Sequence, residues 1–179
     1  PERIKRNRSL VRPIKEIFEE ILPKYNNAIF DNKQENQSFN KNILEFLLTL
    51  ENIDLAYFDP PYGSNNEKMP PSRVRYASYY HIWTTIINHD NPEVFGKANR
   101  RIDSRDGVSA SVFEEFRKNE DGSFIAMEAL RKLIQTTNAR YILLSYSSGG
   151  RATKKELNEI INESGKLLTA IEIDYKKNV

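Results

Sequence analysis

Two short, mostly apolar runs constrain the fold of this chain more than any other feature. Residues 53–58 (IDLAYF) and 141–146 (YILLSY) end directly in turn-forming residues, DPPYG after the first run and SSGG after the second. Short apolar runs bounded in this way are typical of strands buried in a parallel sheet. Residues 167–175 alternate between apolar and polar and predict a third strand.

Apolar residues at helical spacing lie between and around these runs. They predict amphipathic helices over residues 10–22, 40–50, 76–87 and 123–137. Pro23 is expected to end the first helix, and Ser38 or Asn40 to cap the second. The pairs Ser111 with Glu114 and Thr153 with Glu156 have the form of capping boxes, which open a short helix and a final helix that Gly165 ends. Strands that alternate with helices predict an α/β fold with a largely parallel sheet.

Composition excludes several classes of protein. The 179 residues suit one globular domain, and 27 Lys and Arg against 25 Asp and Glu give a net charge of only +2, so gross charge does not indicate a nucleic-acid partner. The absence of cysteine removes disulfides, cysteine nucleophiles and thiolate metal sites, and with only two histidines we expect no metal site. The sequence contains no membrane-length apolar run and no recognisable signal peptide, so we expect a cytoplasmic protein.

The loop that follows residues 53–58 has the strongest chemical character. Its two prolines fix the backbone and lack N–H groups, Asp59 adds a carboxylate acceptor, and Tyr62 adds an aromatic face. Such a loop suits a flat ligand with an exocyclic amine, although a rigid turn without a ligand is the simpler alternative. Ligands of parallel α/β sheets bind at the carboxyl ends of the strands, so the Asp59 and Ser145 loops should lie side by side.

The sequence around this loop resembles motif IV of the amino-methyltransferases, where an apolar strand runs into Asp-Pro-Pro-Tyr. The chain is most similar to the Dam-type DNA adenine N6-methyltransferases, in particular to members that accompany restriction systems. Residues 64–66 (SNN), the stretch KMPPSRVRYASYYHIW and the later YILLSYSSGGR extend the resemblance over about residues 25–179. It implies methyl transfer from S-adenosylmethionine to the N6 amine of an adenine in a specific sequence of double-stranded DNA.

The resemblance also implies roles for the loop residues. Asp59 and the Pro60 carbonyl would accept the two N6 hydrogens of an adenine flipped out of the duplex, and Pro61 and Tyr62 would complete the catalytic loop, with Tyr62 stacked on the base. Two acceptors on the amine favour a pyramidal nitrogen, which is catalysis by orientation rather than by a strong base.

Further residues are assigned on the same basis. Asp59 and Phe58 would contact S-adenosylmethionine. Ser145 and Tyr146 would shape the adenine pocket, although an ordinary strand-to-helix turn explains their loop equally well.

Basic residues near the loop are candidates for contact with DNA phosphates. These are Arg73, Arg75, Lys97, Arg100 and Arg101. The alternative for these basic residues is that they form a charged surface that contacts only solvent. The aromatic stripe from Tyr76 to Trp83 is expected to pack in the core rather than to stack on bases.

One part of the family pattern is absent from the sequence. The seven glycines include no G-x-G pair, although the cofactor loop of these enzymes has the form FxGxG. The resemblance therefore implies a class I, Rossmann-like methyltransferase sheet with helices on both faces, of which this chain holds only the C-terminal half. Residues 1–58 would form a partial helical and β/α segment that leads into the sheet. Residues 59–179 would form the catalytic half with motif IV, including a basic and aromatic insertion at about 64–108 that faces DNA. We expect a fragment of a longer enzyme, with a subunit of a split enzyme or a remnant without activity as alternatives.

The sequence leaves two other functions open. A ribosomal RNA amino-methyltransferase is the second enzymatic hypothesis, because some of these enzymes share DPPY. A non-catalytic DNA-recognition module is the hypothesis from another class. The first hypothesis remains restriction-modification methylation of bacterial DNA, at the nucleoid in the cytoplasm.

Overall fold

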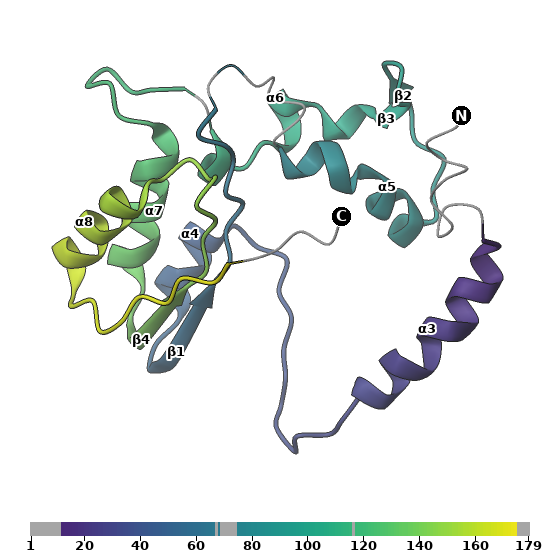
Figure 1. Cartoon of the computed structure of the whole chain (residues 1–179), viewed down its shortest axis with the longest axis horizontal. Helices are drawn as coiled ribbons and strands as arrows, with labels where there is room; N and C mark the ends of the chain where they lie inside the picture. Colours follow the sequence, from purple (N-terminus) through teal and green to yellow (C-terminus); the bar gives the residue numbers. More distant parts are fainter. Residues whose placement is uncertain (1–11, 67, 69–74, 116, 175–179) are drawn as a thin grey trace. The chain divides into compact units, whose positions relative to one another are not determined.

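A computed structural model describes residues 12–66, 68, 75–115 and 117–174 (Figure 1). The chain divides into two compact units, Pro1–Asn40 and Lys41–Val179. Among the described residues, every helix is too short or too polar to cross a bilayer.

The first unit contains one long helix, α3 (Ile14–Ala28). The prediction that Pro23 ends this helix is wrong, because Pro23 lies inside it. A proline removes its own N–H bond but leaves the bonds of the neighbouring turns. Two ion pairs at i,i+4 spacing support the helix here: Lys15 with Glu19 precedes the missing bond, and Lys24 with Glu20 spans the same turn.

Two parallel strands form the sheet of the second unit. β1 (Ile53–Phe58) pairs with β4 (Ala139–Leu144) from Ile53 opposite Ala139 to Phe58 opposite Leu144. The parallel pairing confirms the interpretation of the two apolar runs. The second strand begins and ends two residues earlier than predicted, so Ser145 and Tyr146 lie in the loop that follows it.

The core lies on one face of these strands. Three helical segments cover it: α4 (Ile43–Phe46) with its 3-10 continuation η1 (Leu47–Thr49), α7 (Ile125–Thr136) and α8 (Lys154–Ser164). Phe58 packs in one cluster with Leu133 and Ile160, and α7 lies beside α8 in Figure 1. Asn42 caps α4, in place of the predicted Ser38 or Asn40. The predicted capping box of Thr153 is confirmed at the start of α8.

The opposite face of the strands is exposed in the described part of the chain. Leu55 pairs with Tyr141 and Tyr57 with Leu143, and all four side chains are exposed. The expected second layer of helices is therefore not formed by the described residues.

The predicted third strand is also not formed. Residues 165–174 are not in a strand, and Ile171 and Ile173 are exposed. An alternating pattern becomes a strand only where a neighbouring backbone supplies hydrogen bonds, and no described strand pairs with this segment.

A long segment of short elements separates β1 from α7. It contains α5 (Tyr76–Asn88), the hairpin of β2 (Val94–Phe95) and β3 (Arg100–Arg101), η3 (Ile102–Ser104), α6 (Asp106–Ser109) and η4 (Val112–Glu114). The helix over 76–87 is confirmed. Its aromatic stripe does not pack in the core as expected, because α5 has no buried residue and 56% of Trp83 is exposed.

Candidate active site

The loop after β1 turns sharply at the edge of the sheet. Asp59 is exposed, whereas Pro60 is buried against the fold and cannot shift freely. Gly63 ends the turn with φ of 62°, in the left-handed region that favours glycine. A β-carbon at position 63 would also lie 3.2 Å from the Cα atom of Glu114, so a larger residue would press on the backbone of η4.

The loop after β4 lies directly beside the first loop, as predicted. The Ser145 N–H donates to the Phe58 carbonyl at 2.9 Å and continues the pairing of the strands. The Arg151 N–H donates to the Tyr62 carbonyl at 2.7 Å, and the Asn65 N–H donates to the Gly149 carbonyl at 3.1 Å. Backbone bonds therefore hold the two loops together along their whole length.

Tyr62 joins the side chains of the two loops. Its hydroxyl donates a hydrogen bond to Oδ1 of Asp59 and lies 3.5 Å from Oγ of Ser145. Its ring meets the ring of Tyr146 edge to face, with centroids 5.3 Å apart. The Tyr146 hydroxyl donates to the Tyr62 carbonyl at 3.2 Å and accepts from the Ala152 N–H at 3.1 Å. The four predicted residues Asp59, Tyr62, Ser145 and Tyr146 thus form one connected cluster.

Both phenols of this cluster are neutral at ordinary pH. The hydrogen bond to Asp59 raises the pKa of Tyr62, because ionisation would place two negative charges side by side. Burial raises the pKa of Tyr146. The two tyrosines can therefore donate hydrogen bonds and offer aromatic surfaces, but they do not act as bases.

Two acceptors of this loop accept no hydrogen bond from the described residues. They are Oδ2 of the exposed Asp59 and the carbonyl of the buried Pro60. An exposed carboxylate oxygen, a neighbouring carbonyl and an aromatic face together match a planar ligand that carries an amine. The role of the DPPY loop in binding such a ligand stays a prediction.

Phe58 is placed differently from its neighbour Asp59. Its side chain is buried in the core, where it contacts other apolar residues rather than a ligand surface. Only its backbone, through the carbonyl that pairs with Ser145, belongs to the site.

The basic candidates divide into two groups. Arg75 and Arg101 are each only 5% exposed, Arg75 in an ion pair with Glu115 at 3.3 Å and Arg101 between Asp90 and Asp103 at 2.5 and 2.8 Å. A guanidinium already held by carboxylates is poorly placed to contact a phosphate, so these two residues stabilise the fold in this structure.

Two of the other candidates lie in the hairpin of β2 and β3. Lys97 is exposed and Arg100 is half-buried, with its guanidinium donating to the Ser104 carbonyl. Arg73 lies outside the described residues.

Sequence reasoning missed the place of Glu114. The spacing from Ser111 predicts a capping box, and Ser111 does cap η4 by accepting from the Phe113 N–H. The Glu114 carboxylate, however, accepts from the N–H of Tyr76, the first residue of α5, at 3.1 Å. No local pattern could reveal a partner so distant in the sequence.

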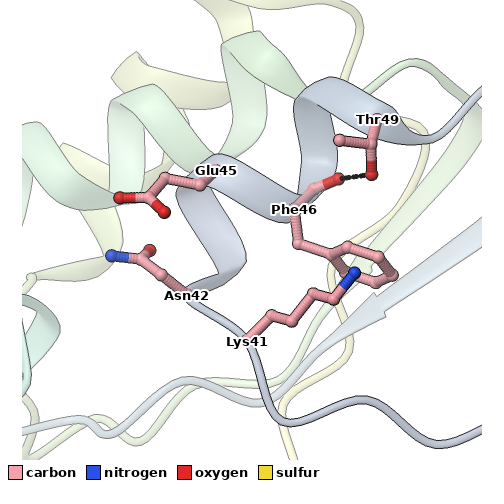
Figure 2. A pocket seen from close by; sticks show the side chains of 5 residues that line it. All are labelled: Lys41, Asn42, Glu45, Phe46 and Thr49. Carbon is pink, nitrogen blue, oxygen red and sulfur yellow. Dashed lines mark hydrogen bonds between the residues drawn. The ribbon is translucent and has the colours of Figure 1, made fainter.

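A separate shallow pocket of about 300 Å³ lies on α4 (Figure 2). Lys41, Asn42, Glu45, Phe46 and Thr49 line it, and the Thr49 hydroxyl donates to the Phe46 carbonyl at 2.7 Å. None of the predicted site residues belongs to this pocket.

Comparison with known proteins finds several DNA methyltransferases that are similar to this chain. Modification methylase StsI from Streptococcus sanguinis is 28% identical over 140 residues, which are 76% of this chain and 18% of the relative. Type II methyltransferase M.FokI from Planomicrobium okeanokoites is 33% identical over 114 residues, 63% of this chain and 14% of the relative. Type II methyltransferase M2.HphI from Haemophilus parahaemolyticus is 27% identical over 160 residues, 88% of this chain and 39% of the relative.

The chain thus spans well under half of the length of each of these relatives. No solved structure matches it. The sequence signature of the D12 class N6 adenine-specific DNA methyltransferases matches residues 6–160, which confirms the resemblance seen in the loop. The chain therefore belongs to the family of D12 class N6 adenine-specific DNA methyltransferases.

Proposed function

We propose that this chain carries the methyl-acceptor site of a restriction-modification DNA methyltransferase, which methylates the N6 amine of an adenine in a specific DNA sequence. The cluster of Asp59 and Tyr62 at the carboxyl end of β1 is the observation that carries this proposal. The names of the relatives, which are modification methylases and type II methyltransferases, support the same activity.

The open acceptors define how the adenine would be held. The amine of a stacked, paired adenine is inaccessible, so the base must leave the duplex to reach the loop. Oδ2 of Asp59 and the Pro60 carbonyl would accept its two N6 hydrogens, while Pro61 keeps the turn stiff. Holding both hydrogens in this way directs the nitrogen lone pair out of the ring system, toward an incoming methyl group.

Aromatic contact would complete the acceptor site. The Tyr62 ring would stack on the flipped base, and Ser145 and Tyr146 would fix the direction of that ring from the second loop. Because the hydroxyl of Tyr62 is bound to Asp59, adenine binding and the orientation of Tyr62 are coupled.

The described part of the chain does not by itself form a cradle for S-adenosylmethionine. The sequence contains no G-x-G pair, and the side chain of Phe58, one of the two expected contacts, is buried. S-adenosylmethionine supplies an electrophilic methyl group in this class of chemistry, and Asp59 is the residue proposed to lie beside it. We propose that another segment or chain provides the glycine-rich loop and covers the exposed face of β1 and β4, as in a class I, Rossmann-like sheet.

The basic and aromatic insertion at about residues 64–108 is proposed to face DNA. Lys97 is an exposed cation of this insertion, and Arg100 belongs to β3. Arg73, Arg75 and Arg101 belong to the same proposal, but the ion pairs of Arg75 and Arg101 would have to open before either could contact a phosphate.

The decisive experiment measures base methylation by the complete protein. Unmethylated bacterial DNA and ribosomal RNA are incubated separately with the protein and labelled S-adenosylmethionine, and the nucleosides are separated by mass spectrometry. We expect label in N6-methyladenine from DNA and none after Asp59→Ala. Label confined to RNA, or DNA binding without any label, would contradict the proposed function.

A further inference from the structure

A buried carboxylate connects the candidate active site to helix α5. Glu114 is only 1% exposed, and its Oε2 atom accepts the N–H of Tyr76 at 3.1 Å. A buried carboxylate is costly unless hydrogen bonds or charges compensate for its lost hydration. Tyr76 is the first residue of α5, where the free N–H groups of a helix favour a negative charge. Glu114 therefore fixes the point at which α5 begins.

The same residue lies against the DPPYG loop. A β-carbon at Gly63 would be 3.2 Å from the Cα atom and 3.4 Å from the Cβ atom of Glu114, so the two backbones are in close contact. Gly63 directly follows Tyr62. Through Glu114, the start of α5 is thus held at a fixed place relative to the catalytic loop.

The neighbouring carboxylate strengthens this connection. Glu115 pairs with Arg75, the residue before α5, at 3.3 Å, and both side chains are buried. Glu115 also pairs with Arg117 at 3.2 Å. Two consecutive glutamates therefore hold two consecutive residues, Arg75 and Tyr76, at the start of the helix.

The ring held in this way is open to solvent on part of its surface. Tyr76 is 37% exposed, and its ring is stacked on Tyr80 with the centroids 5.6 Å apart and the planes within 2°. Burial raises the pKa of its phenol, and the nearby Tyr62 and Asp59 add to this shift. The phenol is therefore neutral at ordinary pH and can donate a hydrogen bond.

We propose that Tyr76 is a second aromatic residue that contacts the target nucleotide, and that Glu114 is the positioning residue that holds Tyr76 beside the DPPYG loop. This inference rests on the proposed function and adds a substrate-contacting residue to it. An aromatic ring that is already stacked on one side loses little conformational entropy when a base packs against it, and every base offers a flat surface for such contact.

The test compares variants of the complete protein in methylation of a DNA duplex that contains its target site. Tyr76→Ala should lower kcat/KM by about tenfold, which corresponds to the loss of one aromatic contact with a base. Tyr76→Phe keeps the ring and should stay within about twofold of the wild type. Tyr25→Ala, which removes an exposed ring from α3, is the matched control and should have no effect.

The role of Glu114 is tested by a double-mutant cycle. Glu114→Gln keeps an oxygen that can accept the Tyr76 N–H and should retain most of the activity, whereas Glu114→Ala should lose about as much as Tyr76→Ala. Both changes should abolish the same contact, that of the Tyr76 ring with the target nucleotide. The double variant should therefore be no worse than either single variant. The fluorescence of 2-aminopurine at the target position of the DNA should fall in parallel with the activity of the variants. Thermal unfolding identifies a variant that has not folded.

Three outcomes would overturn the inference. These are wild-type kinetics in Tyr76→Ala, an equal loss in Tyr76→Phe and Tyr76→Ala, and additive losses in the double variant. If Glu114→Ala does not fold, the comparison of the two Tyr76 variants still decides the first part, and Glu114→Gln decides the second. A wild-type protein that methylates no DNA contradicts the proposed function itself and is thereby distinguished from a failure of the Tyr76 proposal alone.

Discussion

Gly150 and Tyr146 approach so closely that a β-carbon at position 150 would lie 2.6 Å from Cε1 of the tyrosine ring. Only glycine leaves room for the ring at this point. Tyr146 in turn meets the Tyr62 ring edge to face and donates to its carbonyl. A glycine in the loop after β4 therefore determines where the DPPYG loop, on the neighbouring strand, can place its aromatic residue.

We expect Gly150→Ala to destabilise the protein by about 1–3 kcal/mol, as overpacking of a tight contact does, and to reduce methylation as Tyr146 shifts. Urea unfolding and initial rates measure the two effects. Gly149→Ala is the matched control, because a β-carbon there meets only Oγ of Ser147 at an ordinary distance of 3.9 Å. Equal losses in the two variants would contradict the role given to the Tyr146 contact.

Asp59→Ala should lower the rate of methylation by about a hundredfold or more, because the transition state loses an oriented acceptor. Asp59→Asn should keep part of the activity, since an amide oxygen still accepts one N6 hydrogen. DNA affinity, measured by fluorescence anisotropy, should change little in either variant. A full rate in Asp59→Ala would show that the carboxylate is not part of the acceptor site.

The hydroxyl and the ring of Tyr62 should contribute to methylation by different amounts. Tyr62→Phe should cost less than about tenfold in kcat/KM, because the ring remains, whereas Tyr62→Ala should cost more than that through lost stacking. The hydrogen bond to Asp59 raises the pKa of Tyr62, so its contribution is complete at neutral pH and is lost only as pH rises through the raised value. The pH-rate profile between about pH 6 and 9 should therefore be the same for wild type and Tyr62→Phe.

Arg101→Ala should lower the thermal stability of the protein, because it removes the buried cation between Asp90 and Asp103. Arg101 lowers the pKa of both aspartates, so this stabilisation is present above the usual aspartate pKa and is lost as pH falls through the lowered values. Differential scanning calorimetry at neutral and acid pH measures this difference, which should shrink in acid.

Lys97→Ala removes an exposed cation, whereas Arg101→Ala removes a buried one. It should leave thermal stability unchanged, weaken DNA binding and reduce the slope of log affinity against log salt by about 1, as expected for one lost phosphate contact. An unchanged salt slope would remove Lys97 from the proposed DNA surface.

The features that could be predicted from sequence are those that depend on neighbours in the chain. The strand over residues 53–58, the helix over 76–87 and the Thr153 capping box all follow from local spacing, and the structure confirms each. Predictions that depended on a partner remote in the sequence were wrong in two cases. Residues 165–174 have an alternating pattern but no described partner strand, and the stripe on α5 has the spacing of a core helix but is exposed.

The basic residues illustrate the same limit. Arg75 and Arg101 look like surface cations in the sequence, yet they are buried because Glu115, Asp90 and Asp103 happen to meet them. Charge alone does not distinguish a phosphate contact from an internal ion pair, since both need the same guanidinium.

The sequence by itself determined the family of this protein and the composition of its central loop: an apolar strand that ends in Asp59, two prolines and Tyr62, within a chain of the adenine-specific methyltransferase family. Only the tertiary structure decided how the residues of this loop are arranged. Tyr146 reaches the Tyr62 carbonyl from 84 residues away, and Glu114 reaches the Tyr76 N–H from 38 residues away. Proline stiffness and hydrophobic runs act within a few residues, whereas these contacts exist only because the packed core brings distant segments together.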